Sequence, residues 1–213
     1  TGALVNVLRQ AGFTTINRPA REYGLGLSIG NANVSLLELV QAYALLARGG
    51  MPVTLYWDRL NPPVRTSGKH VFSLATCKAL ADILSDSQAR VEAFGIGGPL
   101  DLPFRTAVKT GTSSDFRDNW CIGFTGQFTV GVWVGNFDFR RMKAISGVSG
   151  AGPIFHRVMV ACANGSNPGF PETKQGLVRV RVDKRNGLLW PSTPLLSPDW
   201  AQDEWTFPNR IPA

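Results

Sequence analysis

The sequence has few cysteines and histidines and no long apolar run. Three cysteines among 213 residues are too few, and odd in number, for a disulfide-held fold. No apolar stretch reaches the roughly 18 residues that mark a membrane-spanning helix. Two isolated histidines and three scattered cysteines provide no metal-ligand spacing. We therefore expect no disulfide framework, no membrane span, no metal site and no cofactor.

Charged residues are also scarce, at 17%, whereas 44% of residues are hydrophobic, which excludes a disordered chain. The charge is +7, from 22 basic and 15 acidic residues, so nucleic acid, an anionic surface, a carboxylate substrate or a cell-wall polymer would each suit it. The densest basic runs, 140–143 and 179–185, contain no stacking-aromatic motif. They favour a solvated basic face over a nucleic-acid site.

The sequence begins at Thr1 rather than at a methionine, and amphipathic sequence follows directly, so we expect no signal peptide in it. We expect a part of a longer protein. If this part leaves bare a surface that the remainder covers, it would self-associate.

Apolar periodicity predicts helices over 3–11, from Ser35 to Gly49, after Ser73 and after Pro153. Ser35 and Glu38 have the spacing of a capping box. His156 falls in the last of these helices and is predicted to be a packing residue. Cys77, Cys121 and Cys162 lie inside apolar patterns and are predicted to be buried free thiols.

Alternation predicts strands near 105–112, 119–125 and 128–137, with a tight hairpin at 126–127 joining the last two. A fourth strand, 177–183, is expected near an edge of the same sheet. Segments 17–34, 51–71 and 94–104 are predicted loops, and 190–213 an extended tail. The predicted fold class is α+β, an antiparallel sheet backed by helices, with a boundary between 1–168 and a trailing 169–213.

The first strand ends in Lys109-Thr110-Gly111-Thr112-Ser113. K-T-G is a signature element of β-lactamases and penicillin-binding proteins. A strand edge lets an extended peptide add alongside, and glycine allows its backbone to approach. An ammonium and neighbouring hydroxyls can bind a carboxylate, and a backbone N–H can stabilise an oxyanion. By chance alone, K-T-G-[ST] arises on the order of once in a hundred such chains.

Neighbouring residues allow two interpretations each. Asp115 and Asp118 form either an acid/base pair or, as we prefer, a turn in which Asp118 fixes the backbone and Arg117 pairs locally. Trp120 and Trp133 are expected in the sheet core rather than as a ligand platform. Ser113 and Ser114 either extend the polar rim of the K-T-G site or are ordinary loop residues.

Four ordered blocks share a resemblance: 25–50, 102–125, 130–138 and 147–159. Together they closely resemble the C-terminal half of the transpeptidase domain of class A penicillin-binding proteins, particularly the 1C type. The resemblance implies a penicillin-binding, β-lactamase-like serine transpeptidase fold in a bacterial, peptidoglycan-synthesising enzyme. That enzyme would lie at the periplasmic face of the inner membrane and carry a glycosyltransferase domain and a membrane anchor.

The resemblance also implies roles for the motif residues. Lys109 and Thr112 would be catalytic, and Thr110, Gly111 and Ser113 substrate-binding. Their partners would be the peptidoglycan stem peptide, a lipid II-derived glycan and, in the intact parent, β-lactam antibiotics. Nucleic acid is not an expected partner, and membrane contact would come only from an anchor outside this chain.

Two elements of the family are missing from the sequence. No lysine follows a serine by three positions, and no S-x-N occurs. In the family both motifs precede the K-T-G strand, so truncation is the simplest explanation. We expect a fragment of a D-Ala-D-Ala transpeptidase that is inactive alone. The alternative is a degenerate, non-catalytic module that binds peptidoglycan or a protein.

Overall fold

The computed structural model describes residues 1–58, 60, 68–143, 145–171, 176–190 and 198–211. Parts of the predicted loop 51–71 and of the tail 190–213 therefore lie outside the described residues. The α-helices are α1 (Gly2–Gln10), α2 (Ala20–Tyr23), α3 (Leu36–Ala47), α4 (Leu74–Ser85), α5 (Ser87–Phe94) and α6 (Ala151–Ala163). The strands are β1 (Ala107–Thr112), β2 (Asp118–Phe124), β3 (Thr129–Gly135), β4 (Val178–Asp183) and β5 (Ala201–Thr206).

The main sheet is an antiparallel meander in the order β1-β2-β3. Lys109 lies opposite Ile122, and Gly111 opposite Trp120. The β2–β3 connection is tight, because the Thr125 N–H donates to the Phe128 carbonyl at 2.8 Å. The three consecutive strands and their hairpin are confirmed.

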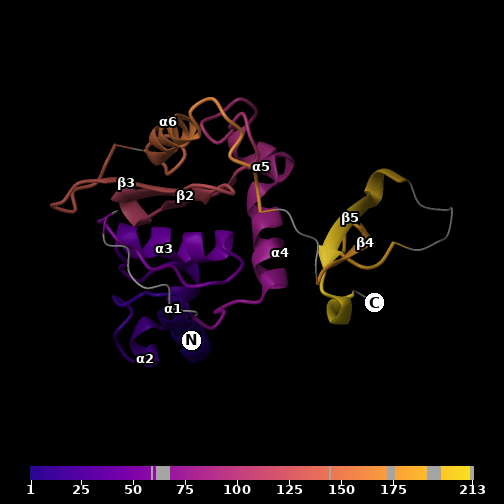
Figure 1. The fold of residues 1–213 in the computed structure, drawn as a ribbon, viewed down its shortest axis with the longest axis horizontal. Helices are drawn as coiled ribbons and strands as arrows, with labels where there is room; N and C mark the ends of the chain where they lie inside the picture. Colours follow the sequence, from indigo (N-terminus) through magenta and orange to yellow (C-terminus); the bar gives the residue numbers. More distant parts are fainter. Residues whose placement is uncertain (59, 61–67, 144, 172–175, 191–197, 212–213) are drawn as a thin grey trace.

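Helices cover both faces of this sheet (Figure 1). α6 packs on one face, where its side chains meet alternate residues of all three strands; the buried members of that core are Leu100, Val108, Cys121, Val130, Val132, Ala151, Phe155 and Met159. α3 and α4 contact the other face, around Ala81, Ala107 and Phe124. This packing explains the glycine-rich face of β3, because a Cβ on Gly131 would clash with the Val40 side chain of α3.

Glu38 anchors α3 to the segment after α1. Ser35 and Glu38 form the predicted capping box, and the Glu38 carboxylate also accepts hydrogen bonds from Thr14 and Thr15, through both their N–H groups and their hydroxyls. Burial raises the pKa of Glu38, but these hydrogen bonds outweigh it and lower the pKa to about 2. The ionised carboxylate thus joins α3 to a second core that includes Val5, Phe13 and Ile16.

The predicted place of the fourth strand was wrong. β4 does not border the main sheet; it pairs antiparallel with β5 in a separate two-stranded sheet, which stands beyond α4 in Figure 1. The tail prediction missed β5 because Ala201–Thr206 mixes polar and apolar residues without clear alternation. At the end of β4, Arg185 hydrogen-bonds Asp183 and lowers its pKa to about 2, while its guanidinium lies 3.9 Å from the centre of the Trp200 ring.

Two smaller predictions also need correction, and one helix was not predicted. Segment 17–34 is not simply a loop, because it contains α2 and a 3-10 turn, Leu25–Ile29. The sequence analysis did not predict α5, whose helical pattern is weak and which ends at Phe94, the first residue of the predicted loop 94–104. Cys162 is exposed, because Phe155, Met159 and Ala163 form the face of α6 that is buried. Cys77 and Cys121 are buried, as predicted.

Candidate functional site

The K-T-G residues occupy the accessible half of an edge strand. Ala107 and Val108 begin β1 fully buried, whereas the residues from Lys109 to Thr112 are exposed or half-buried. Among the described residues no strand pairs with the outer edge of β1. The same strand therefore fixes its first half in the two cores and presents its second half at an open edge.

Lys109 and Gly111 lie on the face of β1 that bears Ala107, the side covered by α3 and α4. The Lys109 ammonium donates to the Thr110 carbonyl at 2.6 Å. A Cβ on Gly111 would meet Trp120 Cβ at 3.5 Å, an ordinary contact. The fold itself therefore does not require glycine at this position, and the missing side chain leaves room for an approaching backbone.

The hydroxyls after the motif support the surrounding backbone. Thr112 Oγ1 accepts a hydrogen bond from the Gly147 N–H at 2.9 Å, and it retains its own O–H as a donor. Ser113 Oγ accepts from the Asp118 N–H at 2.8 Å, while the Ser113 N–H donates to the Asp118 carbonyl at 2.9 Å. Ser113 thus closes the turn between β1 and β2.

Gly147 positions the strand end, a role that motif analysis missed. A Cβ there would lie 2.6 Å from the Gly111 carbonyl oxygen and 2.9 Å from that of Trp120. Only glycine lets this segment lie against β1 so closely. The sequence signal was available, because Gly147 opens the fourth block of the family resemblance.

The two aspartates of the β1–β2 turn have structural partners. Asp115 pairs with Arg141 at 2.9 Å and more loosely with Arg117 at 3.7 Å. The Asp118 carboxylate accepts a hydrogen bond from Trp133 Nε1 at 2.9 Å. These contacts agree with the structural interpretation of both residues rather than with an acid/base pair.

The remaining candidate side chains are packing groups. Trp120 and Trp133 are half-buried neighbours with ring centres 6.4 Å apart. His156 Nδ1 lies 3.1 Å from the Pro99 carbonyl, which fits its predicted packing role. Burial raises the pKa of the Cys121 thiol to about 12, although the Lys109 ammonium acts in the opposite direction. Cys121 is therefore a neutral core residue rather than a nucleophile.

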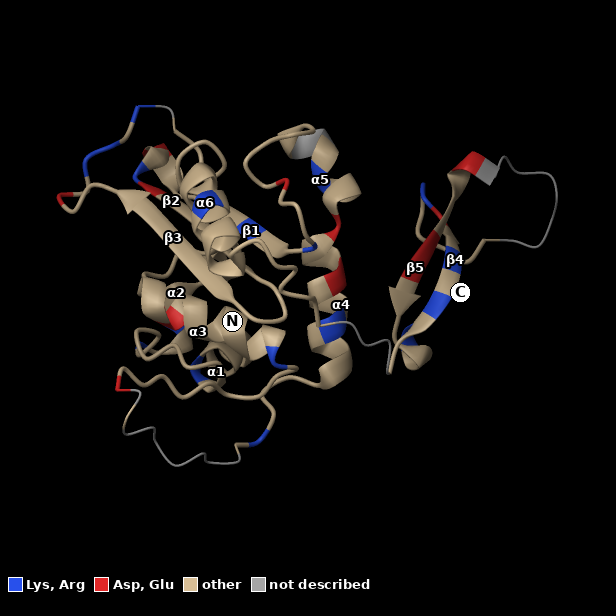
Figure 2. Ribbon diagram, turned by 45° about the horizontal axis from the view of Figure 1, so that its top comes forward, with Lys and Arg blue, Asp and Glu red and all other residues tan. Residues whose placement is uncertain are grey.

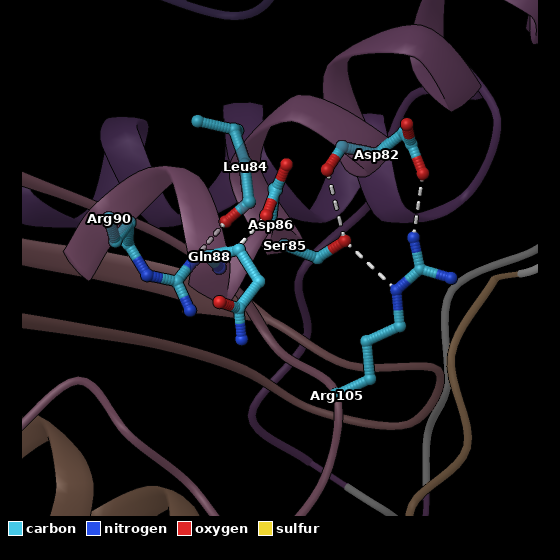
Figure 3. Close-up of polar contacts among 7 residues, drawn as sticks. All are labelled: Asp82, Leu84, Ser85, Asp86, Gln88, Arg90 and Arg105. Atoms are coloured by element: carbon cyan, nitrogen blue, oxygen red, sulfur yellow. Dashed lines mark hydrogen bonds and ion pairs between the residues drawn. The ribbon is translucent and has the colours of Figure 1, made fainter. Parts of the chain in front are cut away.

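A separate pocket of about 540 Å³ lies at the other end of β1, where loop residues 100–106 meet α4 and α5. Figure 3 shows its polar wall, in which Arg105 donates to the Ser85 hydroxyl at 3.0 Å and to the Asp82 carboxylate at 2.8 Å. Arg90 donates to the Leu84 carbonyl at 2.7 Å. The K-T-G residues do not line this pocket, so this pocket and the motif are distinct places.

Within the part of the chain that the structure describes, no group of three or more His, Cys, Asp or Glu is arranged to hold a metal ion. Over the same residues, the helices are too short or too polar to cross a bilayer.

Comparison with known proteins relates the chain to penicillin-binding proteins. It is 25% identical to penicillin-binding protein 1A of Rickettsia felis over 89% of this chain and 27% of that protein. It is 28% identical to penicillin-binding protein 1C of Escherichia coli over 63% of this chain and 16% of that protein. The chain thus spans about a quarter, or less, of the length of these relatives. No family model matches it.

Solved structures show the same fold. The crystal structure of penicillin-binding protein 1A from Haemophilus influenzae superposes with a TM-score of 0.69 over 98% of this chain and 37% of that one, at 17% identity. A penicillin-binding protein of Mycobacterium tuberculosis gives a TM-score of 0.59 over 92% of this chain. The chain is therefore similar in sequence to class A penicillin-binding proteins, and its fold matches that of penicillin-binding protein transpeptidase domains.

Proposed function

We propose that this chain is the substrate-binding wall of a D-Ala-D-Ala transpeptidase that cross-links peptidoglycan stem peptides. The observation that carries the proposal is the K-T-G sequence on the open edge of β1, within a fold shared with these enzymes. The domain would extend to residue 168, and the 1C type would be its nearest kind.

The geometry suggests how the wall acts. An extended peptide adds antiparallel to the edge of β1. Its terminal carboxylate binds the Lys109 ammonium and the Thr110 hydroxyl through charge-assisted hydrogen bonds. Gly111 admits the ligand backbone. The backbone N–H of Thr112 then faces the carbonyl that is attacked, where it stabilises the developing oxyanion.

The nucleophile belongs to the rest of the enzyme in this proposal. The sequence contains no S-x-x-K and no S-x-N, so a serine outside this chain would attack the penultimate D-Ala carbonyl and release D-Ala. An amine of a second stem peptide would then accept the acyl group. β-Lactams would acylate the same serine. The parent would also be a glycosyltransferase at the periplasmic face of the inner membrane, and this chain alone would bind without acylating.

Two measurements on the chain test the proposal. Calorimetric titration with a diacetylated Lys-D-Ala-D-Ala peptide should show binding that Lys109→Ala weakens by about tenfold, the value of a charge-assisted hydrogen bond. Lys184→Ala, an exposed lysine at the end of β4, should leave binding unchanged.

Incubation with benzylpenicillin followed by intact-mass measurement should show no adduct. A covalent adduct would reveal a nucleophile within the chain. Equal binding of the D-Ala-D-Ala peptide and its L-Ala-L-Ala counterpart would instead favour a degenerate module without stereospecific recognition.

A further inference from the structure

Beyond the end of the K-T-G strand, two loops form a projecting tip, defined here as residues 114–117 and 136–143. We propose that this tip is a specificity subsite, which binds side-chain carboxylates on the ligand peptide upstream of its D-Ala-D-Ala end. The inference rests on the proposed function, because it requires a peptide along β1. The ligand class it names is an extended peptide with free carboxylates.

The position of the tip follows from the direction of the strand. The turn after β1 begins at Ser113, immediately after the K-T-G residues, and the chain leaves β3 at Gly135, which lies opposite Asp118 at the start of β2. Both loops therefore project from the same end of the sheet, as Figure 2 shows. The β4–β5 sheet lies on the opposite side of the molecule in both views.

The two loops are joined into one structure. The Met142 N–H donates to the Phe116 carbonyl at 3.0 Å, and Arg141 crosses to Asp115 at 2.9 Å. Within the second loop, Asn136 Nδ2 donates to the Arg140 carbonyl at 2.9 Å. A ligand would therefore meet an organised surface, which reduces the conformational entropy lost on binding.

The tip has an excess of positive charge. It contains four cations, Arg117, Arg140, Arg141 and Lys143, and two carboxylates, Asp115 and Asp138. Asp115 is paired with Arg141 and Asp138 with Arg140. Lys143 is exposed, and no carboxylate of the described residues forms an ion pair with it. The field at the tip is therefore positive and suits a ligand with several carboxylates.

Exposed aromatic rings stand among these cations. Phe137 is 94% exposed and Phe139 is 67% exposed. Phe139 adopts φ of 60° and Phe116 φ of 56°, a left-handed conformation that bulky residues rarely adopt. Such strain persists where the surrounding structure imposes it and is concentrated at functional sites. The rings provide apolar surface for the aliphatic part of a side chain whose carboxylate the cations bind.

In the proposed binding mode, the upstream residues of the ligand peptide reach this tip. Its terminal carboxylate lies at Lys109 and Thr110, and its scissile carbonyl at Thr112. A peptide antiparallel to β1 then continues in the direction of residues 113–117. At about 3.4 Å per residue, two or three upstream residues extend about 7–10 Å past Thr112. Those residues are the ones whose carboxylates would meet the tip.

The experiment compares three fluorescently labelled peptides by anisotropy. One is a pentapeptide ending in D-Ala-D-Ala with free carboxylates on its second and third side chains. Its twin has carboxamides there, and a short D-Ala-D-Ala tripeptide ends before the tip. We expect the carboxylate peptide to bind several-fold more tightly than its twin, and salt to reduce the difference.

The variant Arg140→Gln with Lys143→Gln leaves both Arg–Asp115 contacts in place. It should abolish the carboxylate preference while the tripeptide binds as before. The matched control, Lys184→Gln with Arg210→Gln, removes two exposed charges near β4–β5 and should keep the preference. Circular dichroism establishes that each variant is folded.

The outcomes separate this inference from the function on which it rests. If the tripeptide binds but the two pentapeptides bind equally, the tip inference is wrong and the proposed function stands. If none of the peptides binds, the proposed function fails first. Tip-dependent binding to phosphatidylglycerol vesicles, without any carboxylate preference, would also overturn the inference by identifying the tip as a membrane contact.

Discussion

The two sheets of this molecule are built differently. The β1-β2-β3 sheet lies between α6 on one face and α3 with α4 on the other, and Ala107, Val108, Cys121 and Phe124 are buried in its cores. Among the described residues, the β4–β5 sheet has two strands, and half-buried valines alternate with exposed arginines along the first four residues of β4. A two-stranded sheet is only marginally stable alone, whereas three strands packed against helices form a stable sheet.

This difference between the two sheets explains where a strand can keep one edge accessible. Lys109 to Thr112 are presented at an open edge because Ala107 and Val108, in the same strand, are fixed in two cores. β4 has no such anchor along most of its length. An accessible strand edge of defined position therefore needs a buried segment next to it.

The largest expected effect is in the covered sheet. Phe155 is fully buried between α6 and the strands, so Phe155→Ala should lower the free energy of unfolding by about 3–5 kcal/mol. Val158→Ala, at a partly exposed position of the same helix, should cost about 1 kcal/mol or less. Urea denaturation measures both, and equal effects would contradict the assignment of the buried face of α6.

Glu38→Gln should cause the next largest loss in the free energy of unfolding. The pKa of Glu38 is about 2 in the fold against an ordinary 4.5, which corresponds to about 3 kcal/mol. Because the folded pKa is the lower one, this stabilisation is present above about pH 4.5 and is lost as the pH falls towards 2. Unfolding at pH 7 and pH 3 should therefore differ more for the native chain than for the variant. The exposed control Glu22→Gln should behave like the native chain.

Gly131→Ala and Gly111→Ala together distinguish a glycine needed for packing from one needed for ligand access. The new Cβ would clash with Val40 of α3, and overpacking of this kind costs about 1–3 kcal/mol. Gly111→Ala, in the neighbouring part of the sheet, meets only an ordinary contact. We expect it to retain stability and to lose affinity for the D-Ala-D-Ala peptide. A stability loss as large as that of Gly131→Ala would show that Gly111 serves the fold.

The smallest effect should come from β4–β5. Arg179 and Asp203 pair across these strands at 2.8 Å, but exposed pairs contribute about 0–1 kcal/mol. Arg179→Ala should leave global unfolding unchanged and speed hydrogen exchange of β4 and β5 amides only. In the native chain these amides should already exchange faster than those of β2. Equal protection of the amides of both sheets from hydrogen exchange would contradict this difference in stability.

Local patterns predicted the covered sheet well. The capping box at Ser35, the apolar stripes of the helices and the alternation from 105 to 137 each agreed with the burial they imply. β5 was missed because its own residues show no clear strand pattern. Its conformation depends on pairing with β4, which is a tertiary contact. Cys162 was misplaced because it adjoins the apolar stripe of α6, and only packing decides which face is buried.

The site was predictable in part. The K-T-G motif and its place at a strand end followed from sequence, and the structure shows why the strand is positioned there. The hydrogen bond from Gly147 to Thr112 and the pairing of Arg141 with Asp115 join residues 35 and 26 positions apart in sequence. Such contacts depend on how loops return to the sheet, and no local period predicts them.

The most direct test of the proposed peptide site is an amide chemical-shift map of the chain titrated with the diacetylated Lys-D-Ala-D-Ala peptide. We predict that the largest shifts fall on Lys109 to Thr112 and that L-Ala-L-Ala does not reproduce them. Shifts confined to the pocket beside Arg105 or to β4–β5, with the K-T-G amides unmoved, would contradict it.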